Sequence, residues 1–254
     1  MPAARVLVTT SWDDGHQLDE KLAQELDDHG FAATFYIAPR SAEIPSAQRL
    51  TRAALDDIAT RFEIGSHTLT HPHLTRLPLA AAVREITQGQ AELQQMTGHE
   101  VISFCYPYGA YRAEHVTAVR AAGFQVARTI RRFCTTPPAD PLQMATTTHA
   151  ARYLGDAWPV LRDSRARGAA WATWRNWDVL ARQLFQEARA ASGVYHLWGH
   201  SWEIEAHGDW ARLRGLLRYI AGHDGVTFLT NGELAGRLRG QRAGGGAAGP
   251  GAER

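Results

Sequence analysis

Residues 11–16 read Ser-Trp-Asp-Asp-Gly-His, and residues 65–71 read Gly-Ser-His-Thr-Leu-Thr-His. Each stretch follows a run rich in apolar and β-branched residues, at 5–10 and at 62–64, which predicts that each lies at the end of a strand. Two imidazoles and one carboxylate form a typical ligand set for a divalent metal that keeps a position open for water. A second carboxylate beside the ligand is available as a general base. Together the two stretches predict metal-assisted hydrolysis.

Strand-like and helix-like segments alternate along the remaining chain. We expect strands at 5–10, 32–38, 62–66, 101–105, 125–130, 193–198 and 226–230, and helices at 17–29, 46–60, 79–97, 112–122, 175–191 and 208–222. This alternation predicts parallel β–α units that are either closed into a barrel or doubly wound. Residues 131–170 give no clear pattern. The tail at 240–254 is too rich in Gly and Ala to build a core, so we expect one folded domain at 1–239 followed by a disordered tail.

The composition excludes several classes of protein. Of the 254 residues, 44% are hydrophobic and 21% charged, and Lys+Arg 27 against Asp+Glu 26 gives no net attraction to nucleic acid or to an anionic membrane. We find neither a signal peptide nor an apolar run long enough to span a bilayer. Cys105 and Cys134 are the only cysteines, which is no disulfide framework and favours a reducing cytoplasm. The oligomeric state stays open.

The paired carboxylates and the paired histidines each have a plainer interpretation. Asp13, Asp14 and Gly15 could form a simple turn, although two adjacent charges are costly without a cation nearby. In a straight strand the two carboxylates would face opposite sides, but Gly15 permits a bend that turns both toward one site. His67 and His71 could be two surface histidines, yet a spacing of four within one turn puts them on the same side.

Two further clusters follow predicted strands, where functional groups of parallel α/β folds gather. The turn at 106–109 could supply backbone N–H groups to an oxyanion, or it could be a plain turn. Either His196 or His200 could act as a general acid, and His200 is better placed because it comes at the expected strand end. Trp198 and Trp202 flank it and could stack on a sugar, although aromatic core is the commoner role.

Two other features favour a structural interpretation. Cys105 could be a nucleophile, but a metal-activated water makes one unnecessary. Trp171, Trp174 and Trp177 recur at every third position, which is typical of a helical core stripe and less often of a substrate wall.

In the order of its motifs, the chain resembles the polysaccharide deacetylases, metal-dependent carbohydrate esterases with the chitooligosaccharide deacetylase homology domain. The similarity is carried by residues 12–15, 66–71 and 107–109 and by a late histidine in an apolar strand, and it spans roughly 5–235. The resemblance implies a distorted (β/α) barrel with about seven parallel strands. It also implies a small-molecule or oligosaccharide substrate.

The resemblance also assigns roles to single residues. It implies that Asp13 is the general base and that Asp14, His67 and His71 hold a divalent metal, most often Zn²⁺. It implies that the backbone N–H of Tyr108 stabilises the oxyanion, and that His200 is the general acid. Trp12, His196, Trp198, Trp202 and Arg128 remain candidates for contacts with substrate.

The chain departs from the family pattern in two places. Cys105 stands where the family usually has an arginine that orients the base, and Arg128 at the end of the next strand is a possible substitute. No clean match exists to the family's Asp-Trp element that tunes the acid. We therefore expect a hydrolase that removes an N-acyl group, acetyl first, from an amino sugar or a related small amide. The alternatives are an allantoinase-like hydrolase of a cyclic amide or ureide and an inactive sugar-binding homologue. An Fe(II) oxygenase also uses two histidines and a carboxylate, but usually in another order.

Overall fold

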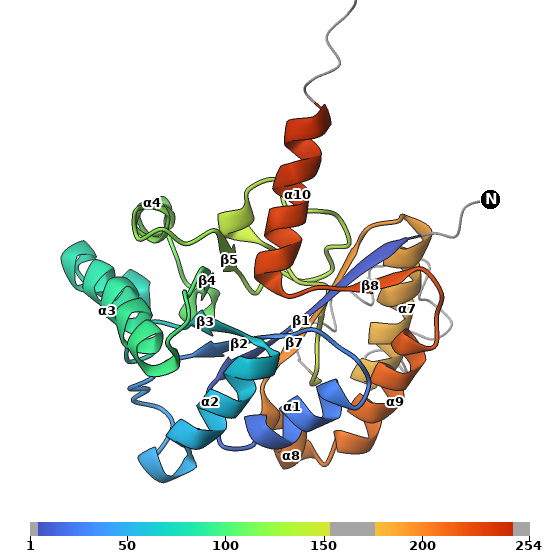
Figure 1. The fold of residues 1–254 in the computed structure, drawn as a ribbon, viewed down its shortest axis with the longest axis horizontal. Helices are drawn as coiled ribbons and strands as arrows, with labels where there is room; N and C mark the ends of the chain where they lie inside the picture. The colour runs from blue at the N-terminus through green and yellow to red at the C-terminus, as the bar shows by residue number, and fades with distance from the viewer. Residues whose placement is uncertain (1–4, 153–175, 246–254) are drawn as a thin grey trace, which may run out of the picture.

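The computed structural model describes residues 5–152 and 176–245. All the strand pairs in it are parallel, in the order β5-β4-β3-β2-β1-β7-β6, with β8 pairing separately with β1 (Figure 1). The sheet curls into a distorted barrel, which confirms the predicted fold class. The strands are β1 (Val6–Asp14), β2 (Thr34–Ile37), β3 (Glu63–Ser66), β4 (Ser103–Cys105), β5 (Val126–Arg128), β6 (Thr148–His149), β7 (Val194–Gly199) and β8 (Val226–Phe228).

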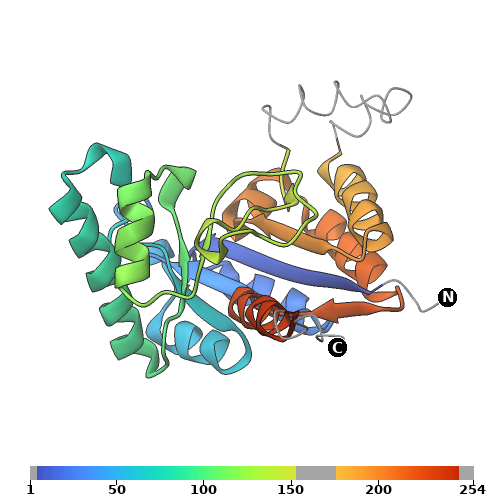
Figure 2. The same ribbon diagram turned by 90° about the horizontal axis from the view of Figure 1, so that it is seen from above.

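Helices cover the outside of the sheet. In Figure 2 the strands run between the green helices α3 and α4 on one side and the orange helices α7 and α9 on the other. The described helices are α1 (Asp19–Asp27), α2 (Arg52–Arg61), α3 (Leu79–Thr97), α4 (Ala113–Ala121), α7 (Trp177–Ala190), α8 (Ser201–His207), α9 (Trp210–Ala221) and α10 (Asn231–Gly245), with 3-10 turns η1 (Ser46–Gln48), η2 (Leu74–Arg76), η3 (Pro107–Gly109) and η4 (Pro141–Gln143).

The periodicity of the sequence explains where most helices begin and end. Helix α3 ends where Gly98 adopts φ 72°, a left-handed C-cap that glycine adopts without strain. The helix expected at 208–222 corresponds to α9. The short helix α8 before it was not expected, and it ends at Gly208, which has φ 66°. The short β6 lies within the stretch whose pattern was unclear. No described helix is both long enough and apolar enough to cross a membrane.

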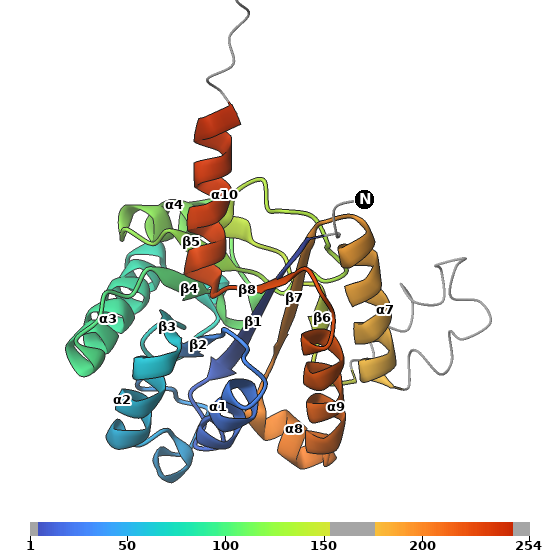
Figure 3. The same cartoon turned by 45° about the vertical axis from the view of Figure 1, so that its right-hand side comes forward.

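The first residues of helix α10 contact the amino-terminal ends of two strands. Its first residue, Asn231, donates its N–H to Thr34 Oγ1 at the start of β2, and Gly232 donates its N–H to Glu63 at the start of β3. The helix then projects away from the sheet (Figure 3). It continues to Gly245, past residue 240 where the tail is expected to begin. Arg and Gln at 239–242 are good helix formers and carry the helix past Gly240.

Candidate active site

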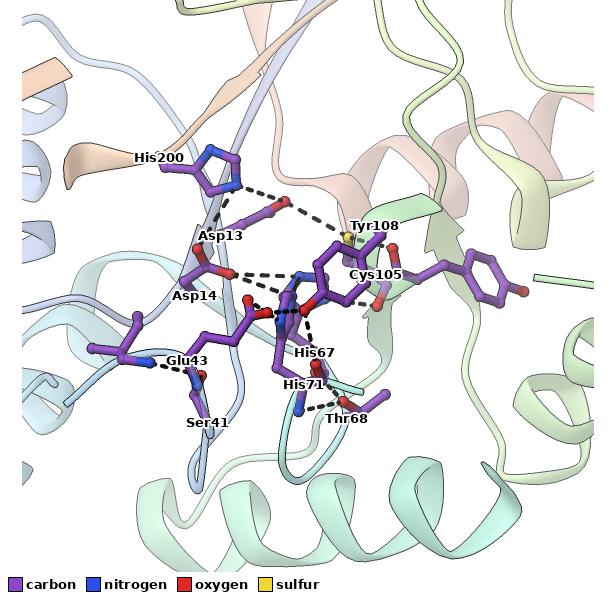
Figure 4. A network of polar contacts seen from close by, with 12 residues as sticks. Asp13, Asp14, Ser41, Glu43, His67, Thr68, His71, Cys105, Tyr108 and His200 are labelled. Atoms are coloured by element: carbon purple, nitrogen blue, oxygen red, sulfur yellow. Dashed lines mark hydrogen bonds and ion pairs between the residues drawn. The ribbon is translucent and has the colours of Figure 1, made fainter. Parts of the chain in front are cut away.

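The polar side chains of the sequence motifs lie at the carboxyl ends of the strands. Asp13 and Asp14 end β1, and His67 follows β3. Arg128 ends β5, and His200 follows β7. Figure 4 shows the carboxylates of β1 facing the two histidines of the 65–71 stretch, with His200 on the other side of the carboxylates. The parallel topology explains this arrangement, because the carboxyl ends of parallel strands meet at the same edge of the barrel.

Asp14, His67 and His71 form a triangle of potential ligand atoms. Asp14 Oδ1 lies 3.8 Å from His67 Nε2 and 3.5 Å from His71 Nε2, and the two Nε2 atoms are 3.1 Å apart. A tetrahedral ion with bonds of about 2.1 Å separates its ligands by about 3.4 Å. The three atoms therefore have the spacing that one small divalent cation requires.

The outer nitrogen of each ring indicates which tautomer is favoured. His67 Nδ1 lies 2.8 Å from the carbonyl oxygen of Cys105, which accepts its hydrogen bond, and His71 Nδ1 lies 2.9 Å from Glu43 Oε2, an ion-pair distance without hydrogen-bond alignment. With both protons on Nδ1, the two Nε2 lone pairs point at each other, and a cation between them removes the repulsion. Burial, then the neighbouring His71, holds the pKa of His67 well below its usual range, so this ring stays neutral as a ligand must be.

Several strained backbone positions lie at this site. Asp14, His71 and Tyr108 have positive φ angles of 87°, 64° and 57° although none is glycine. Such conformations persist only where the surroundings impose them, and they cluster at functional sites. At His71 the surroundings include Glu85 of α3, whose carboxylate accepts the N–H groups of Leu69 and Thr70 at 3.1 and 2.9 Å.

Asp13 is buried against a cation. The guanidinium of Arg128 donates to Asp13 Oδ2, and the same nitrogen lies 2.8 Å from Cys105 Sγ. Among the described residues Asp13 Oδ1 has no hydrogen-bond partner, so one carboxylate oxygen is fixed and the other is free to accept a proton. The residue that the sequence suggested as a substitute for the missing arginine therefore does contact the expected base.

Arg128 is stabilised by its surroundings although it is completely buried. Its guanidinium lies 4.5 Å from the ring centroid of Trp198 and 5.5 Å from that of Tyr36. Aromatic faces on a desolvated guanidinium are favourable, and the Asp13 charge adds to them. A substrate-binding role for Arg128 is contradicted, because the side chain contacts Asp13 and has no exposed surface.

His200 has two partners that lie outside the sequence motifs. Its Nδ1 hydrogen-bonds Glu203 on α8, and Glu203 also lies 3.0 Å from Nε2 of the buried His149. Its Nε2 faces the carboxylates, 4.0 Å from Asp13 and 3.8 Å from Asp14. Burial alone would lower the pKa of His200, but the hydrogen bond to Glu203 and the nearby carboxylates raise it to about 9. His200 can thus hold a proton at neutral pH, as a general acid must.

A cavity of about 430 Å³ joins these groups. Tyr108, Ile130 and Trp202 at its wall are among the most exposed large hydrophobic side chains of the described residues, and Trp202 Nε1 also donates to Asp14 Oδ2 at 3.0 Å. An apolar rim above polar groups is typical of a ligand site. The lining residues are Asp13, Asp14, Glu43, His67, His71, Tyr106, Tyr108, Ile130, Trp198, His200 and Trp202.

Besides Arg128, two further residues that were expected to contact substrate are contradicted. Trp12 has no exposed surface and packs in the core, because alternation along β1 points it away from the face that carries Asp13. His196 lies inside the barrel, where its Nε2 is 2.8 Å from Ser11 Oγ. Trp198 does line the cavity but is only 6% exposed. Trp177 is buried, as a core stripe predicts, while Trp171 and Trp174 lie outside the described residues.

Comparisons with known proteins agree with this geometry. The polysaccharide deacetylase family model matches residues 2–127, whereas no curated protein sequence matches the chain. A crystal structure described as a putative polysaccharide deacetylase from Mycobacterium smegmatis is 15% identical, with a TM-score of 0.71 over 95% of this chain and 93% of that one. A family 4 acetyl xylan esterase from Clostridium thermocellum, with a cobalt ion, is 18% identical, with a TM-score of 0.56 over 92% of each chain. At these identities the structures show a shared fold.

Proposed function

Because the chain belongs to the polysaccharide deacetylase family, whose members hydrolyse acetyl amides or esters, we propose that it is a metal-dependent deacetylase. Its substrate is an N-acylated amino sugar or a related small amide. The observation that carries the proposal is the triangle of Asp14, His67 and His71, with Asp13 and His200 on the same cavity. The cobalt ion in the Clostridium thermocellum esterase supports a divalent metal.

The residues around the triangle fit a bound cation, with Asp14, His67 and His71 as its ligands and Zn²⁺ as the first candidate. When bound, such a cation lowers the pKa of a water molecule and polarises the acyl carbonyl. Asp13 Oδ1, the oxygen that Arg128 leaves free, accepts the proton of the attacking water. The backbone N–H of Tyr108 stabilises the developing oxyanion.

The leaving group decides between amide and ester substrates. An alkyl amine is a poor leaving group unless it is protonated, whereas an activated alcohol leaves unaided. His200 Nε2 faces the carboxylates while Glu203 holds Nδ1, so this ring is oriented to donate a proton into the cavity. This orientation supports an N-acyl substrate. The exposed rim of Tyr108, Ile130 and Trp202 supports a sugar face as the group that binds there.

The alternatives predict different products. A hydrolase of cyclic ureides would open a ring without releasing acetate, and an inactive sugar-binding homologue would turn over nothing. The missing family arginine favours inactivity, but Arg128 contacts Asp13 from another strand and weakens that alternative.

Acetate release from N-acetyl amino sugars, measured beside ring opening of cyclic ureides, tests the proposal. We expect acetate release that a chelator abolishes and added Zn²⁺ or Co²⁺ restores. His200→Ala should reduce hydrolysis of an alkyl amide far more than that of an activated aryl ester, at unchanged metal content. His196→Ala is the control, and it should affect both substrates alike. Substrate-selective loss in His196→Ala alone would move the acid to that residue, and ring opening without acetate release would refute the deacetylase.

A further inference from the structure

Glu43 contacts two separate parts of the site. It lies between β2 and α2 and is held by its own N–H, which donates to Ser41 Oγ at 3.3 Å. Its Oε2 is 2.9 Å from His71 Nδ1, and its Oε1 accepts a hydrogen bond from the hydroxyl of Tyr108 (Figure 4). Glu43 lies outside the sequence motifs that carry the family resemblance.

The first contact makes the two histidines of the triangle unequal. His67 Nδ1 donates a hydrogen bond to a neutral backbone carbonyl, whereas His71 Nδ1 lies at ion-pair distance, 2.9 Å, from a carboxylate oxygen. A carboxylate behind a ligating histidine fixes the ring orientation and raises the basicity of the opposite nitrogen. The backbone of His71 is itself in a conformation, φ 64°, that persists only where the surroundings impose it.

The second contact fixes the turn that carries the expected oxyanion donor. Tyr108 also has a strained backbone, and its ring stacks on His73 with centroids 3.6 Å apart and planes 10° from parallel. Its ring lies 4.7 Å from that of His71. One carboxylate therefore ties the turn at 107–109 to the histidine across the cavity.

We propose that Glu43 is a positioning residue that orients His71 toward the metal and at the same time holds the Tyr108 turn in place. The inference rests on the proposed metal-dependent function. The two contacts use different oxygens of Glu43, so they can be removed separately. Tyr108→Phe deletes the hydroxyl, which bonds Glu43 and also, at 3.4 Å, the backbone carbonyl of His71. Glu43→Gln removes the charge but keeps the shape, and Glu43→Ala removes both contacts of the carboxylate.

The test measures the Zn²⁺ dissociation constant by competition with a chromogenic chelator, together with turnover of an N-acetyl sugar. Glu43→Ala should weaken Zn²⁺ binding by about 10- to 100-fold, the range for supporting partners of metal ligands, with Glu43→Gln weakened less. Tyr108→Phe should keep the dissociation constant within about twofold while it lowers kcat, because the hydroxyl bonds Glu43 and the backbone carbonyl of His71 but not the imidazole. Glu114→Gln, an exposed carboxylate on α4, is the matched control and should change neither quantity.

The outcomes separate this inference from the proposed function. Unmodified protein that binds no Zn²⁺ would overturn both. Unmodified protein that binds Zn²⁺ and is active, with Glu43→Ala binding equally well, would overturn the role of Glu43 alone. That role would also be overturned if Tyr108→Phe weakened metal binding as much as Glu43→Ala, because the Tyr108 hydroxyl, and not the carboxylate beside the ring, would then support His71. Circular dichroism of the metal-free variants checks that each is folded, and Glu43→Gln replaces Glu43→Ala if the latter is not.

Discussion

Arg128 and Asp13 form a buried ion pair that joins β5 to β1 across the interior of the barrel. The residues are 115 positions apart in the chain, and their side chains are 0% and 4% exposed. Cys105 is the register partner of Arg128 on β4 and contacts the same guanidinium nitrogen. The small side chain of Cys105 leaves space for the longer side chain of Arg128. The guanidinium therefore reaches Asp13 from the neighbouring strand β5.

Arg128→Met should lower the free energy of unfolding by about 3–5 kcal/mol, because it leaves the Asp13 charge buried and unpaired. Asp13→Asn in the same chain removes that charge and should recover part of the loss. Denaturant unfolding of the two single variants and the double variant measures the coupling. Strictly additive losses would show that the pair does not interact.

Asp13→Asn should keep the metal and lower turnover by about 100-fold or more, since the amide cannot accept the proton from water. Metal content by elemental analysis and kcat on an N-acetyl sugar check this. Asp14→Asn is the natural comparison and should lose metal. If Asp13→Asn strips the metal while Asp14→Asn keeps it, the two carboxylates have exchanged roles.

Local sequence patterns were sufficient for every described strand except β6, for most helices and for the group of Asp13, Asp14, His67 and His71. These residues lie at the ends of β1 and β3 or in the turn after β3, so topology alone brings them to one edge. Trp12 and His196 were wrong as substrate contacts because nearness to a motif along the chain does not reveal which face of a strand a side chain occupies.

Local sequence patterns do not identify the residues that contact and orient the site residues. Glu43 lies on a loop, and its partners His71 and Tyr108 come from two other segments of the chain. Glu203 is three residues from His200, but nothing in the sequence shows that helix α8 begins between them and turns the carboxylate back. His149 lies on a strand of two residues, too short to give a period. Such contacts depend on how elements pack, which one sequence does not encode locally.

Turnover should fall as pH rises through the pKa of His200, which the hydrogen bond to Glu203 holds above its usual value. The acid must be protonated, so activity is present below that pH and lost above it. Glu203→Gln removes the charge that stabilises the imidazolium and should move this alkaline limb to lower pH. Glu205→Gln, on the same helix but paired with the exposed Lys21, should leave it in place. An unshifted limb in Glu203→Gln would show that another group controls it.

Gly89→Ala should displace the turn that carries His71. A Cβ at Gly89 would lie 2.5 Å from the carbonyl carbon of Thr68 and 2.7 Å from Leu69 N, so α3 or the turn must move. We expect a loss of about 1–3 kcal/mol in unfolding free energy, with weaker metal binding. Gly236→Ala in α10 is the control, because its Cβ meets nothing closer than 3.8 Å, and alanine there should stabilise by about 0.5–1 kcal/mol. Equal effects of the two changes would contradict the close packing.

The metal content of the purified protein tests the central claim most directly. Elemental analysis should find about one divalent ion per chain, and His67→Ala and His71→Ala should each lose most of it, because two remaining ligands bind weakly. Acetate release from an N-acetyl sugar, measured on the same samples, should disappear together with the metal. Metal-free protein that still releases acetate at the full rate would contradict the account.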